Sequence, residues 1–326
     1  MRKTEIISPE TPVADLAQAV EKGLSQTPKR LPSWMFYDET GDRLFQSIMH
    51  MPEYYLTNCE YEILKLYKEE FFKLFTSDGS PFELVEFGAG DGLKTEILLR
   101  HFTEKKAPFS YLPVDVSEAV LDQLAGRLQK SIPDLSLHPI NKRYEDAIRI
   151  LHQEDPVRKV FLFLGANIGN FTLPDAHAFV KKISSGMHPG DQLLIGFDLK
   201  KDPRLIHAAY DDAQGITRDF NLNLLVRLNR ELGARFQTDQ FSHYPYYDPE
   251  TGITKSYLVS QQEQDVYIEY FDRSFHFDRW EVIHTEISQK YDHTMIHQLA
   301  DHAGLKITNH FHDTKKYFCD VLLGKQ

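Results

Sequence analysis

The chain has little cysteine and no long hydrophobic run, and both shortages narrow what it can be. Its two cysteines, Cys59 and Cys319, lie far apart in the sequence, which predicts neither a disulfide framework nor a zinc site, and we expect no metal. The best apolar run, FLFLG at 161–165, is far shorter than the roughly 18 residues of a membrane-spanning helix. The beginning of the chain contains acidic side chains and no unbroken apolar stretch, unlike a signal peptide. We therefore expect a reduced, cytoplasmic protein with no membrane partner.

Positive charge is also in deficit, because 37 Lys and Arg residues face 48 Asp and Glu residues, a formal net charge of −11. Nucleic-acid binders displace counterions with a basic surface, and the sequence has no Lys/Arg-rich segment that would form one. We therefore expect no nucleic-acid partner. A negative field is compatible with a cationic small molecule, although acidity by itself mostly reflects solubility. We expect a monomer that acts on a small molecule.

At 326 residues the chain is long enough for one large α/β domain and a second lobe. Residues 81–202 alternate between apolar strands and amphipathic helices, which predicts a parallel, doubly wound sheet. The strands are expected at 82–87, 110–114, 135–140, 159–164 and 192–198, and the helices at 94–102, 117–129 and 174–185.

The carboxyl-terminal residues 289–326 are expected to complete the same domain. The pattern predicts a helix at 293–303 and extended runs at 305–312 and 316–324, whose short connection indicates an antiparallel hairpin. A parallel sheet that finishes in such a hairpin is typical of class I methyltransferases and not of dehydrogenases. The expected fold is therefore α/β, a class I methyltransferase sheet with a C-terminal antiparallel hairpin.

The remaining residues do not continue this winding. Residues 1–80 are mostly helical in pattern and rich in aromatics, and residues 203–288 contain a long helical stretch, 204–234, followed by segments of period two. An insertion before the last strands is expected to lie over the carboxyl ends of the sheet, where ligands bind in such folds. We interpret 1–80 and 203–288 as one discontinuous α+β substrate-binding lobe.

A glycine-rich turn directly follows an apolar strand in the sequence VEFGAGDGLKT, 85–95. Glycines allow a tight turn and close approach of the backbone to a ligand. Dinucleotide enzymes use a GxGxxG spacing, but here the third glycine comes one residue early. Glu86, Gly88 and Gly90 are therefore predicted to bind the methionine part of S-adenosylmethionine. Asp115, at the end of the next strand, is predicted to accept both ribose hydroxyls, with helix capping by the Asp-Val-Ser turn as the alternative.

Five longer stretches resemble the L-histidine Nα-methyltransferases of ergothioneine biosynthesis. The resemblance extends over about residues 20–325, with the motifs in the same order and at similar spacing. It implies a methyltransferase core with a helical and sheet-like cap, and transfer of three methyl groups to the amino nitrogen of histidine to give hercynine. The stretches are FYDETGDRLFQSI (36–48), MPEYYLTNCEYEIL (51–64), FLGANIGNF (163–171), HAAYDDAQGITRDFNLNLLVRLNREL (207–232) and HTEISQKY (284–291).

The resemblance also implies roles for single residues. The amino acid is expected to contact Tyr54, Asn170, Tyr210, Glu286 and Ser288. Its amino group is expected to lie near Tyr37, which we take as the catalytic residue. The cofactor is expected to contact Gly88, Lys94 and Asp115.

Each of these roles has a competing structural interpretation. Glu286 and Ser288 face the same side of a strand, and a carboxylate beside a hydroxyl suits an imidazole, whereas a surface pair of Glu286 with Lys290 is the alternative. Asn170 follows an apolar strand and could donate to the substrate carboxylate or satisfy the local backbone. Tyr210 could donate to the same carboxylate or be packing.

Two positions depart from the family's pattern. An Asp-Phe pair that meets the adenine is replaced by Arg143-Tyr144, so Tyr144 is expected to stack on the adenine, whose hydrogen-bond partner stays open. A methionine near the substrate ring is replaced by Ser256, which predicts a wider or more polar pocket. Relatives of the family methylate a prenylated tryptophan. One alternative is therefore a methyltransferase for another amino acid. Two further alternatives are a dehydrogenase and a non-catalytic ligand-binding protein.

Overall fold

Two compact units make up the chain in the computed structural model, which describes residues 13–153 and 157–325. Within these ranges the first unit comprises 58–199 and 291–325, and the second comprises 13–57 and 200–290. One boundary differs from our expectation. Residues 58–80, which we assigned to the lobe, belong to the first unit because helix α3 (Tyr55–Phe75) packs there; the ring centroids of Phe71 and Phe311 are 4.5 Å apart.

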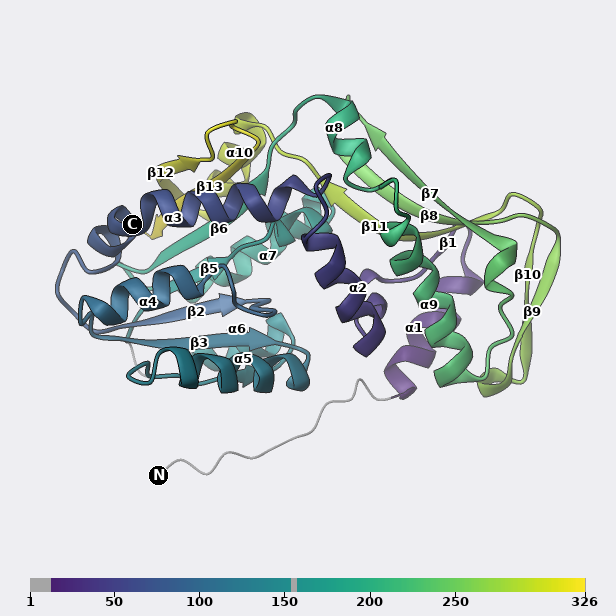
Figure 1. Cartoon of the computed structure of the whole chain (residues 1–326), viewed down its shortest axis with the longest axis horizontal. Helices are drawn as coiled ribbons and strands as arrows, with labels where there is room; N and C mark the ends of the chain where they lie inside the picture. Colours follow the sequence, from purple (N-terminus) through teal and green to yellow (C-terminus); the bar gives the residue numbers. More distant parts are fainter. Residues whose placement is uncertain (1–12, 154–156, 326) are drawn as a thin grey trace. The chain divides into compact units, whose positions relative to one another are not determined.

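The first unit is built on a seven-stranded sheet in the order β12-β13-β6-β5-β2-β3-β4 (Figure 1). Strands β6 to β4 of this order run parallel, whereas β13 is antiparallel to both β6 and β12. The expected α/β fold with a C-terminal antiparallel hairpin is thereby confirmed. The strand predicted at 135–140 is reduced to β4. The strands are β2 (Phe82–Phe87), β3 (Phe109–Asp115), β4 (Ile140–Asn141), β5 (Arg158–Phe163), β6 (Gln192–Asp198), β12 (Leu305–His312) and β13 (Phe318–Lys325).

Polar side chains begin several helices of this unit by accepting the first amide hydrogen bonds. Ser117 accepts from the Val120 amide at 3.3 Å and thereby starts α5. Helices α6, α7 and α10 bury one apolar cluster against the sheet. Among the described residues, no helix combines the length and the apolar character that crossing a membrane requires. The helices are α4 (Glu96–Glu104), α5 (Glu118–Ser131), α6 (Tyr144–Leu151), α7 (Leu173–Ser185) and α10 (His293–Ala303), with a 3-10 turn η2 (Asn167–Asn170).

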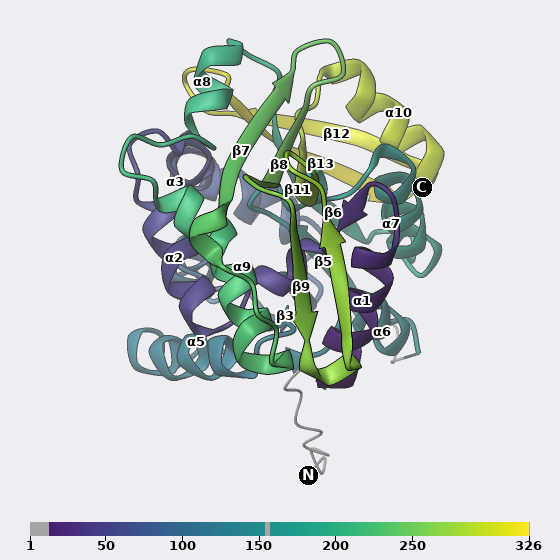
Figure 2. The ribbon, with the colours of Figure 1, turned by 90° about the vertical axis from the view of Figure 1, so that its right-hand side faces the viewer.

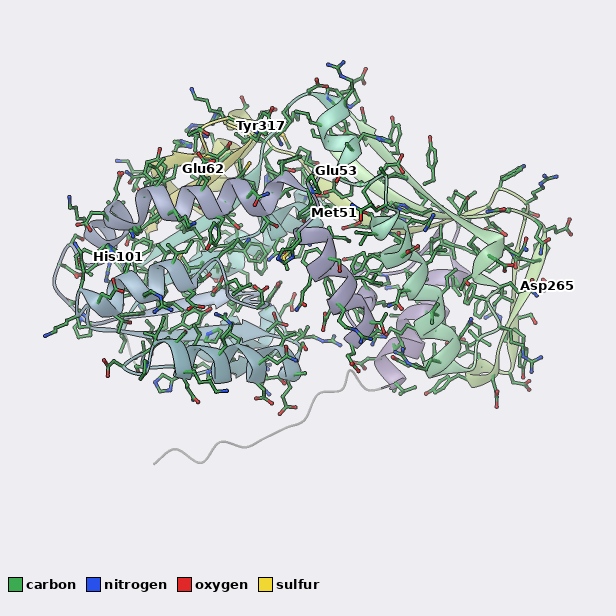
Figure 3. All side chains as sticks on the ribbon, viewed as in Figure 1. Met51, Glu53, Glu62, His101, Asp265 and Tyr317 are labelled. Carbon is green, nitrogen blue, oxygen red and sulfur yellow. The ribbon has the colours of Figure 1, made fainter. Side chains whose placement is uncertain are left out.

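The turn between β12 and β13 is held by one carboxylate. Oδ1 of Asp313 accepts hydrogen bonds from the amides of Tyr317 and Phe318, both at 2.7 Å. Glu62 of α3 accepts from the Thr314 amide at 3.1 Å, so the turn is also tied to that helix; Figure 3 labels Glu62 and Tyr317. The carboxyl-terminal hairpin is therefore fixed at its tip as well as along its strands.

The second unit contains a four-stranded sheet in the order β1-β11-β8-β7 and a separate β9–β10 hairpin (Figure 2). Strand β8 alternates strictly, because its even-numbered residues are buried and its odd-numbered residues are partly exposed, as in a sheet covered on one face. The strands are β1 (Lys29–Arg30), β7 (Phe241–Asp248), β8 (Ile253–Ser260), β9 (Gln264–Ile268), β10 (Arg273–Phe277) and β11 (Val282–Gln289).

The helical stretch predicted at 204–234 is divided into two helices in the structure. Gly215 adopts the left-handed region with φ of 73°, and the Asp212 carboxylate accepts the amides of Ile216 at 2.9 Å and Thr217 at 2.8 Å. Asp212 thus stabilises the first turn of a second helix. The helices of this unit are α1 (Val13–Ser25), α2 (Glu39–Met49), α8 (Pro203–Ala208) and α9 (Ile216–Leu232), with 3-10 turns η1 (Ser33–Phe36), η3 (Thr238–Gln240) and η4 (Glu269–Phe271).

Candidate active site

The glycine turn, residues 88–92, follows β2, an interior strand of the seven-stranded sheet. All three of its glycines have positive φ: 70° at Gly88, 54° at Gly90 and 62° at Gly92. Side chains other than glycine are strained in this region, which explains the GxGxG spacing. The amide of Gly88 donates to the Val114 carbonyl of β3 at 2.8 Å, so the turn is fixed to the neighbouring strand.

Two of these glycines differ in what surrounds them. A Cβ added at Gly88 would lie 2.5 Å from the Tyr144 hydroxyl and 3.1 Å from Nδ2 of Asn167, so glycine there is required by packing. A Cβ added at Gly90 would meet no atom of the protein within 4 Å. Gly90 is therefore bare backbone facing open space, as a close approach to a ligand requires.

Glu86 lies beneath the turn with only 4% of its surface exposed. One carboxylate oxygen accepts from the Thr95 hydroxyl at 2.7 Å, and the other accepts from the Tyr111 hydroxyl. Burial raises the pKa of Glu86 from 4.5 to about 7, against the opposing effect of these two hydrogen bonds. Both of its oxygens are engaged inside the unit, so Glu86 ties β2, β3 and the start of α4 together under the turn.

Asp115 ends β3, next to the turn. Its Oδ2 accepts from the Gly90 amide at 3.1 Å and its Oδ1 from the Ser117 amide at 3.0 Å. A carboxylate oxygen can accept more than one hydrogen bond, so each oxygen keeps capacity for a ligand hydroxyl. Ser117, and not Asp115, caps the following helix. Burial raises the pKa of Asp115, while the amides of Ser117 and Gly90 oppose that rise.

Lys94 lies just beyond the turn and forms an ion pair with Glu60 of α3, a residue with no exposed surface. The Glu60 carboxylate also accepts from the Gly165 amide, at 2.7 Å and 3.0 Å to its two oxygens. Burial lowers the pKa of Lys94, but Glu60 outweighs it and the net direction is upward, so the ammonium form is favoured. Glu60 thus joins α3, the start of α4 and the end of β5 at one point.

Tyr144 begins α6 and is half-buried. Its ring lies edge-on to Phe87 and to Phe163, with centroids 5.9 Å and 5.6 Å away. Its hydroxyl lies against Gly88, as described above. The side chain therefore borders the glycine turn with an aromatic face held by the core of the unit.

Asn170 is the last residue of η2, which follows β5 at the same carboxyl edge of the sheet as the glycine turn. Its side chain is exposed. Asn170 thus belongs to the first unit, whereas the other residues expected to bind the amino acid belong to the second.

The second unit carries a polar patch on the buried side of its four-stranded sheet, which we call the polar face and define as Thr254, Ser256, Glu286 and Ser288. Ser256 is the cross-strand partner of Glu286, and Thr254 that of Ser288. The Ser256 hydroxyl donates to Glu286 at 3.2 Å. Ser256 and Thr254 are 1% and 2% exposed, so side chains with hydroxyl groups occupy buried positions where apolar side chains are usual.

Lys290 connects Tyr210 to this polar face. Its Nζ donates to the Tyr210 hydroxyl at 2.7 Å and to the Ser288 hydroxyl at 2.8 Å, and it lies 4.8 Å from the centre of the Tyr210 ring. Lys290 has no exposed surface. A surface pair of Glu286 with Lys290, the competing interpretation, is therefore wrong, because the lysine is buried.

Glu286 is half-buried on β11, directly after a bulge between His284 and Glu286. A bulge adds one residue and reorients the side chains that follow. Burial raises the pKa of Glu286, while the Ser256 hydroxyl and the charge of Lys290 oppose the rise. Burial thus disfavours the charged form of this carboxylate, and a hydrogen-bond donor from a ligand would stabilise that form.

Tyr37 and Tyr54 come together through one aromatic ring. Phe45 lies edge-on to both, with centroids 5.8 Å from Tyr37 and 6.4 Å from Tyr54. Tyr54 also packs against the small cluster that contains Tyr210 and Tyr247. Tyr247 is the cross-strand partner of Thr254, which connects this cluster to the polar face.

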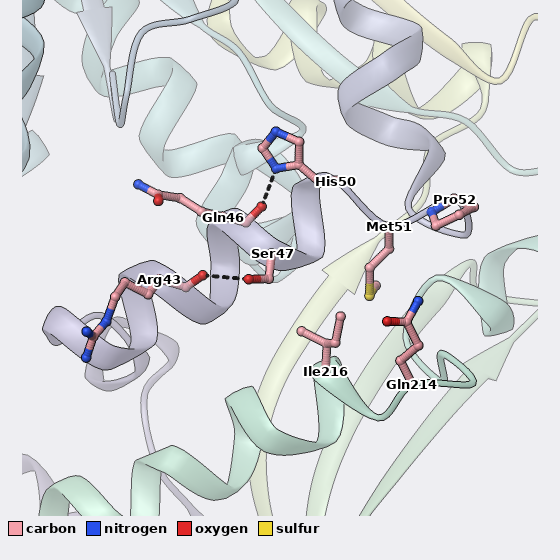
Figure 4. Close-up of a pocket in the computed structure, with 8 residues that line it drawn as sticks. All are labelled: Arg43, Gln46, Ser47, His50, Met51, Pro52, Gln214 and Ile216. Atoms are coloured by element: carbon pink, nitrogen blue, oxygen red, sulfur yellow. Dashed lines mark hydrogen bonds between the residues drawn. The ribbon is translucent and has the colours of Figure 1, made fainter.

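A hollow opens elsewhere on the second unit, between α2 and the start of α9 (Figure 4). Its polar groups bond to their own helix: the Ser47 hydroxyl donates to the Arg43 carbonyl at 3.0 Å, and Nδ1 of His50 lies 2.7 Å from the Gln46 carbonyl. None of the predicted substrate residues lines it. The lining residues are Arg43, Gln46, Ser47, His50, Met51, Pro52, Gln214 and Ile216.

The predicted residues thus fall into two groups. Around the glycine turn of the first unit lie Glu86, Gly88, Gly90, Lys94, Asp115 and Tyr144, with Asn170 at the same sheet edge. The second unit holds Glu286, Ser288 and Tyr210 at or beside the polar face, Tyr54 packed against Tyr210, and Tyr37 connected to Tyr54 through Phe45. Sequence reasoning assigned no functional role to Glu60, Lys290 or Tyr247. Lys290 stands inside the quoted motif HTEISQKY, and the presence of a lysine two residues from Ser288 was the available signal.

Comparison with known proteins supports one chemistry for the two groups. A family model described as "Histidine-specific methyltransferase, SAM-dependent" matches residues 16–325. The histidine N-alpha-methyltransferase of Mycobacterium tuberculosis is 34% identical over 85% of this chain and 84% of its own length. The enzyme of the same description from Mycolicibacterium smegmatis is 33% identical over 91% of both chains. An L-tryptophan methyltransferase of Psilocybe serbica is 31% identical over 93% of this chain and 91% of its own.

Proposed function

The chain belongs to the family of histidine-specific, S-adenosylmethionine-dependent methyltransferases, and we propose that it transfers three methyl groups in turn to the α-amino nitrogen of L-histidine, giving hercynine. The proposal places the reaction in ergothioneine biosynthesis, in line with the name of a relative from Schizosaccharomyces pombe, ergothioneine biosynthesis protein 1, which is 29% identical over 95% of this chain. This chain spans 40% of that longer relative, so the proposal covers the methyl transfer only.

The observation that carries the proposal is the polar face joined to Lys290 and Tyr210. An imidazole offers an N–H on one ring edge, for which the half-buried Glu286 carboxylate is an acceptor. The Tyr210 hydroxyl accepts from the Lys290 ammonium, and a phenol O–H is a donor that suits a carboxylate. A side chain with an N–H and an α-carboxylate are the two ends of histidine, so each end finds a hydrogen-bond partner.

The residues around the glycine turn fit S-adenosylmethionine. We propose that the open backbone at Gly90 receives its methionine part, that Asp115 accepts its ribose hydroxyls, and that Tyr144 borders its adenine. Lys94 supplies a positive charge held by Glu60, suited to a carboxylate. We propose that Glu86 holds this turn from beneath, because its two oxygens are already bonded to Thr95 and Tyr111.

When bound, S-adenosylmethionine supplies a methyl carbon that its sulfonium activates toward nucleophiles. The protein must then hold the amine of histidine in its neutral form and in line with that carbon, which is a matter of positioning. We propose that Tyr210 donates to the substrate carboxylate, and that Tyr54 and Tyr37 flank the amino end. Contact of Asn170 with the substrate stays a prediction from the family resemblance. Weak tyrosine contacts suit a nitrogen that becomes bulkier with each transfer better than a strong base would. One proton leaves the nitrogen to solvent or a nearby acceptor before each of the three transfers.

The experiment is an incubation of the protein with S-adenosylmethionine and a panel of free amino acids, followed by mass spectrometry. We expect histidine to gain one, two and then three methyl groups. Tryptophan is the sharpest competitor, because a relative named as an L-tryptophan methyltransferase is 31% identical and Ser256, in place of the family's methionine, predicts a wider or more polar pocket. Preferred turnover of tryptophan would support that second candidate, and cofactor binding without any product would show a non-catalytic protein.

Two further features belong to the proposal. We propose a monomer, because each of the two ligand groups is assembled from residues of one chain. We also propose that the protein works in the cytoplasm, where a free amino acid and S-adenosylmethionine are both available. Light scattering of the purified protein tests the first, and fractionation of cells that produce it tests the second.

A further inference from the structure

Four histidines and one cysteine gather at one edge of the first unit. His310 and His312 lie on β12, Cys319 lies on β13, and His293 and His297 lie on α10, which Figures 1 and 2 both show over this hairpin. No role in methyl transfer uses them. Strand β12 is four strands from β2 in the sheet, about 19 Å at the usual strand spacing, so the cluster is separate from the glycine turn.

The geometry points to a metal site: we propose that His310, His312 and Cys319 bind a zinc-type divalent cation, with His293 as the fourth ligand. Nδ1 of His310 lies 3.8 Å from the Cys319 sulfur, and Nε2 of His312 lies 3.7 Å from it. Tetrahedral zinc with ordinary Zn–S and Zn–N bonds places these atoms about 3.6 Å apart. Two of the three required separations are therefore already those of the complex.

The strand register explains why these side chains meet. His310 and His312 are two residues apart and point to the same side of β12, and His312 is the cross-strand partner of Cys319. The ligand atoms of all three lie within 4.8 Å of one another. His310 is exposed, so its ring can turn inward without disturbing the core.

Helix α10 supplies the fourth position. The ring of His293, at the start of the helix, lies 5.5 Å from that of His310 and 5.6 Å from that of His312, measured between centroids. His297 follows one helical turn later, 6.1 Å from His310. A bound cation would therefore tie the start of α10 to the edge strand β12.

Binding of a cation requires the thiolate form of Cys319 and a neutral imidazole at each histidine ligand. Binding replaces the S–H bond by a sulfur–metal bond and releases that proton to the buffer. Affinity therefore falls as the pH is lowered.

The test uses the full chain without a histidine tag, stripped of metal with a chelator and titrated with Co²⁺ and then Zn²⁺. We expect one equivalent to bind, a thiolate-to-cobalt charge-transfer absorption to appear, and zinc to raise the thermal unfolding midpoint by on the order of 5 °C when it is present at about a hundred times its dissociation constant. Cys319→Ser should abolish the charge-transfer absorption. His302→Asn, on the same helix beside His177 and away from the cysteine, is the matched control and should behave as wild type.

The outcomes separate cleanly. If Cys319→Ser fails to fold by circular dichroism, His310→Asn provides the second variant, since this exposed residue can change without loss of packing, and it should weaken binding at least about tenfold. Metal binding without the charge-transfer absorption, or binding equal in wild type and His310→Asn, would overturn the site and indicate scattered surface histidines. Methyl-transfer activity is unaffected by either result, so the proposed function is tested separately.

Discussion

Replacing the buried carboxylate Glu86 by glutamine should remove a pH dependence of stability. Burial places the pKa of Glu86 at about 7 in the folded protein, against 4.5 when exposed. The folded state therefore binds more protons than the unfolded state between these values, and wild-type stability falls as the pH rises through this range. The difference corresponds to about 3 kcal/mol, fully developed above pH 7. Glu86→Gln keeps the shape and has no charge to bury.

Urea unfolding between pH 5 and pH 8 measures this directly. Glu86→Gln should gain about 3 kcal/mol on wild type over that range, and Glu104→Gln, an exposed control on α4, should follow wild type. Parallel curves for wild type and Glu86→Gln would refute the assignment of Glu86 as a buried, part-protonated acid. The same variant should bind S-adenosylmethionine within about threefold of wild type if Glu86 only supports the turn; a much larger loss would show direct contact.

Three other substitutions test the two ligand groups. Gly88→Ala should destabilise the protein by about 2–4 kcal/mol, because the residue has positive φ and the added Cβ would clash with the Tyr144 hydroxyl. In a double-mutant cycle measured by urea unfolding, Tyr144→Phe should restore about 1–2 kcal/mol of that loss. Losses that simply add would contradict the contact. Lys290→Met should raise the KM for histidine at least about tenfold, since Tyr210 loses its charged partner, and an unchanged KM would exclude that role. Glu286→Gln should weaken histidine binding by about 10–100-fold in calorimetry. The same substitution should raise the stability of the protein at neutral pH, because burial raises the pKa of the wild-type carboxyl. Equal affinity would remove Glu286 from the imidazole site.

Much of the fold followed from period and turn chemistry. The alternation of apolar strands with amphipathic helices predicted the parallel sheet, and the short connection after 305–312 predicted the hairpin. The break between α8 and α9 was not located from the sequence, because the helical period continues through it. It depends on a left-handed Gly215 and the Asp212 cap, which act locally against that period. The placement of α3 was missed because tertiary packing, such as Phe71 on Phe311, decides it.

The site residues were predictable where the residue type alone indicates the role. They were not predictable where the role depends on whether the side chain is buried. Glycines at 88, 90 and 92 signalled their turn because few other residues tolerate positive φ. Lys290 was weighed as a surface partner of Glu286, since lysine is rarely buried, and only the structure shows its bonds to Tyr210 and Ser288. The cysteine at 319 suggested no metal because its histidine neighbours come from another strand and a helix.

The most direct test of the proposed reaction locates the methyl groups themselves. The protein is incubated with histidine and S-adenosylmethionine whose methyl group carries deuterium, and the product is fragmented in a mass spectrometer. The account predicts three labelled methyl groups, all on the α-amino nitrogen. Label on a ring nitrogen, or a product that stops at one methyl group with excess donor present, would contradict it.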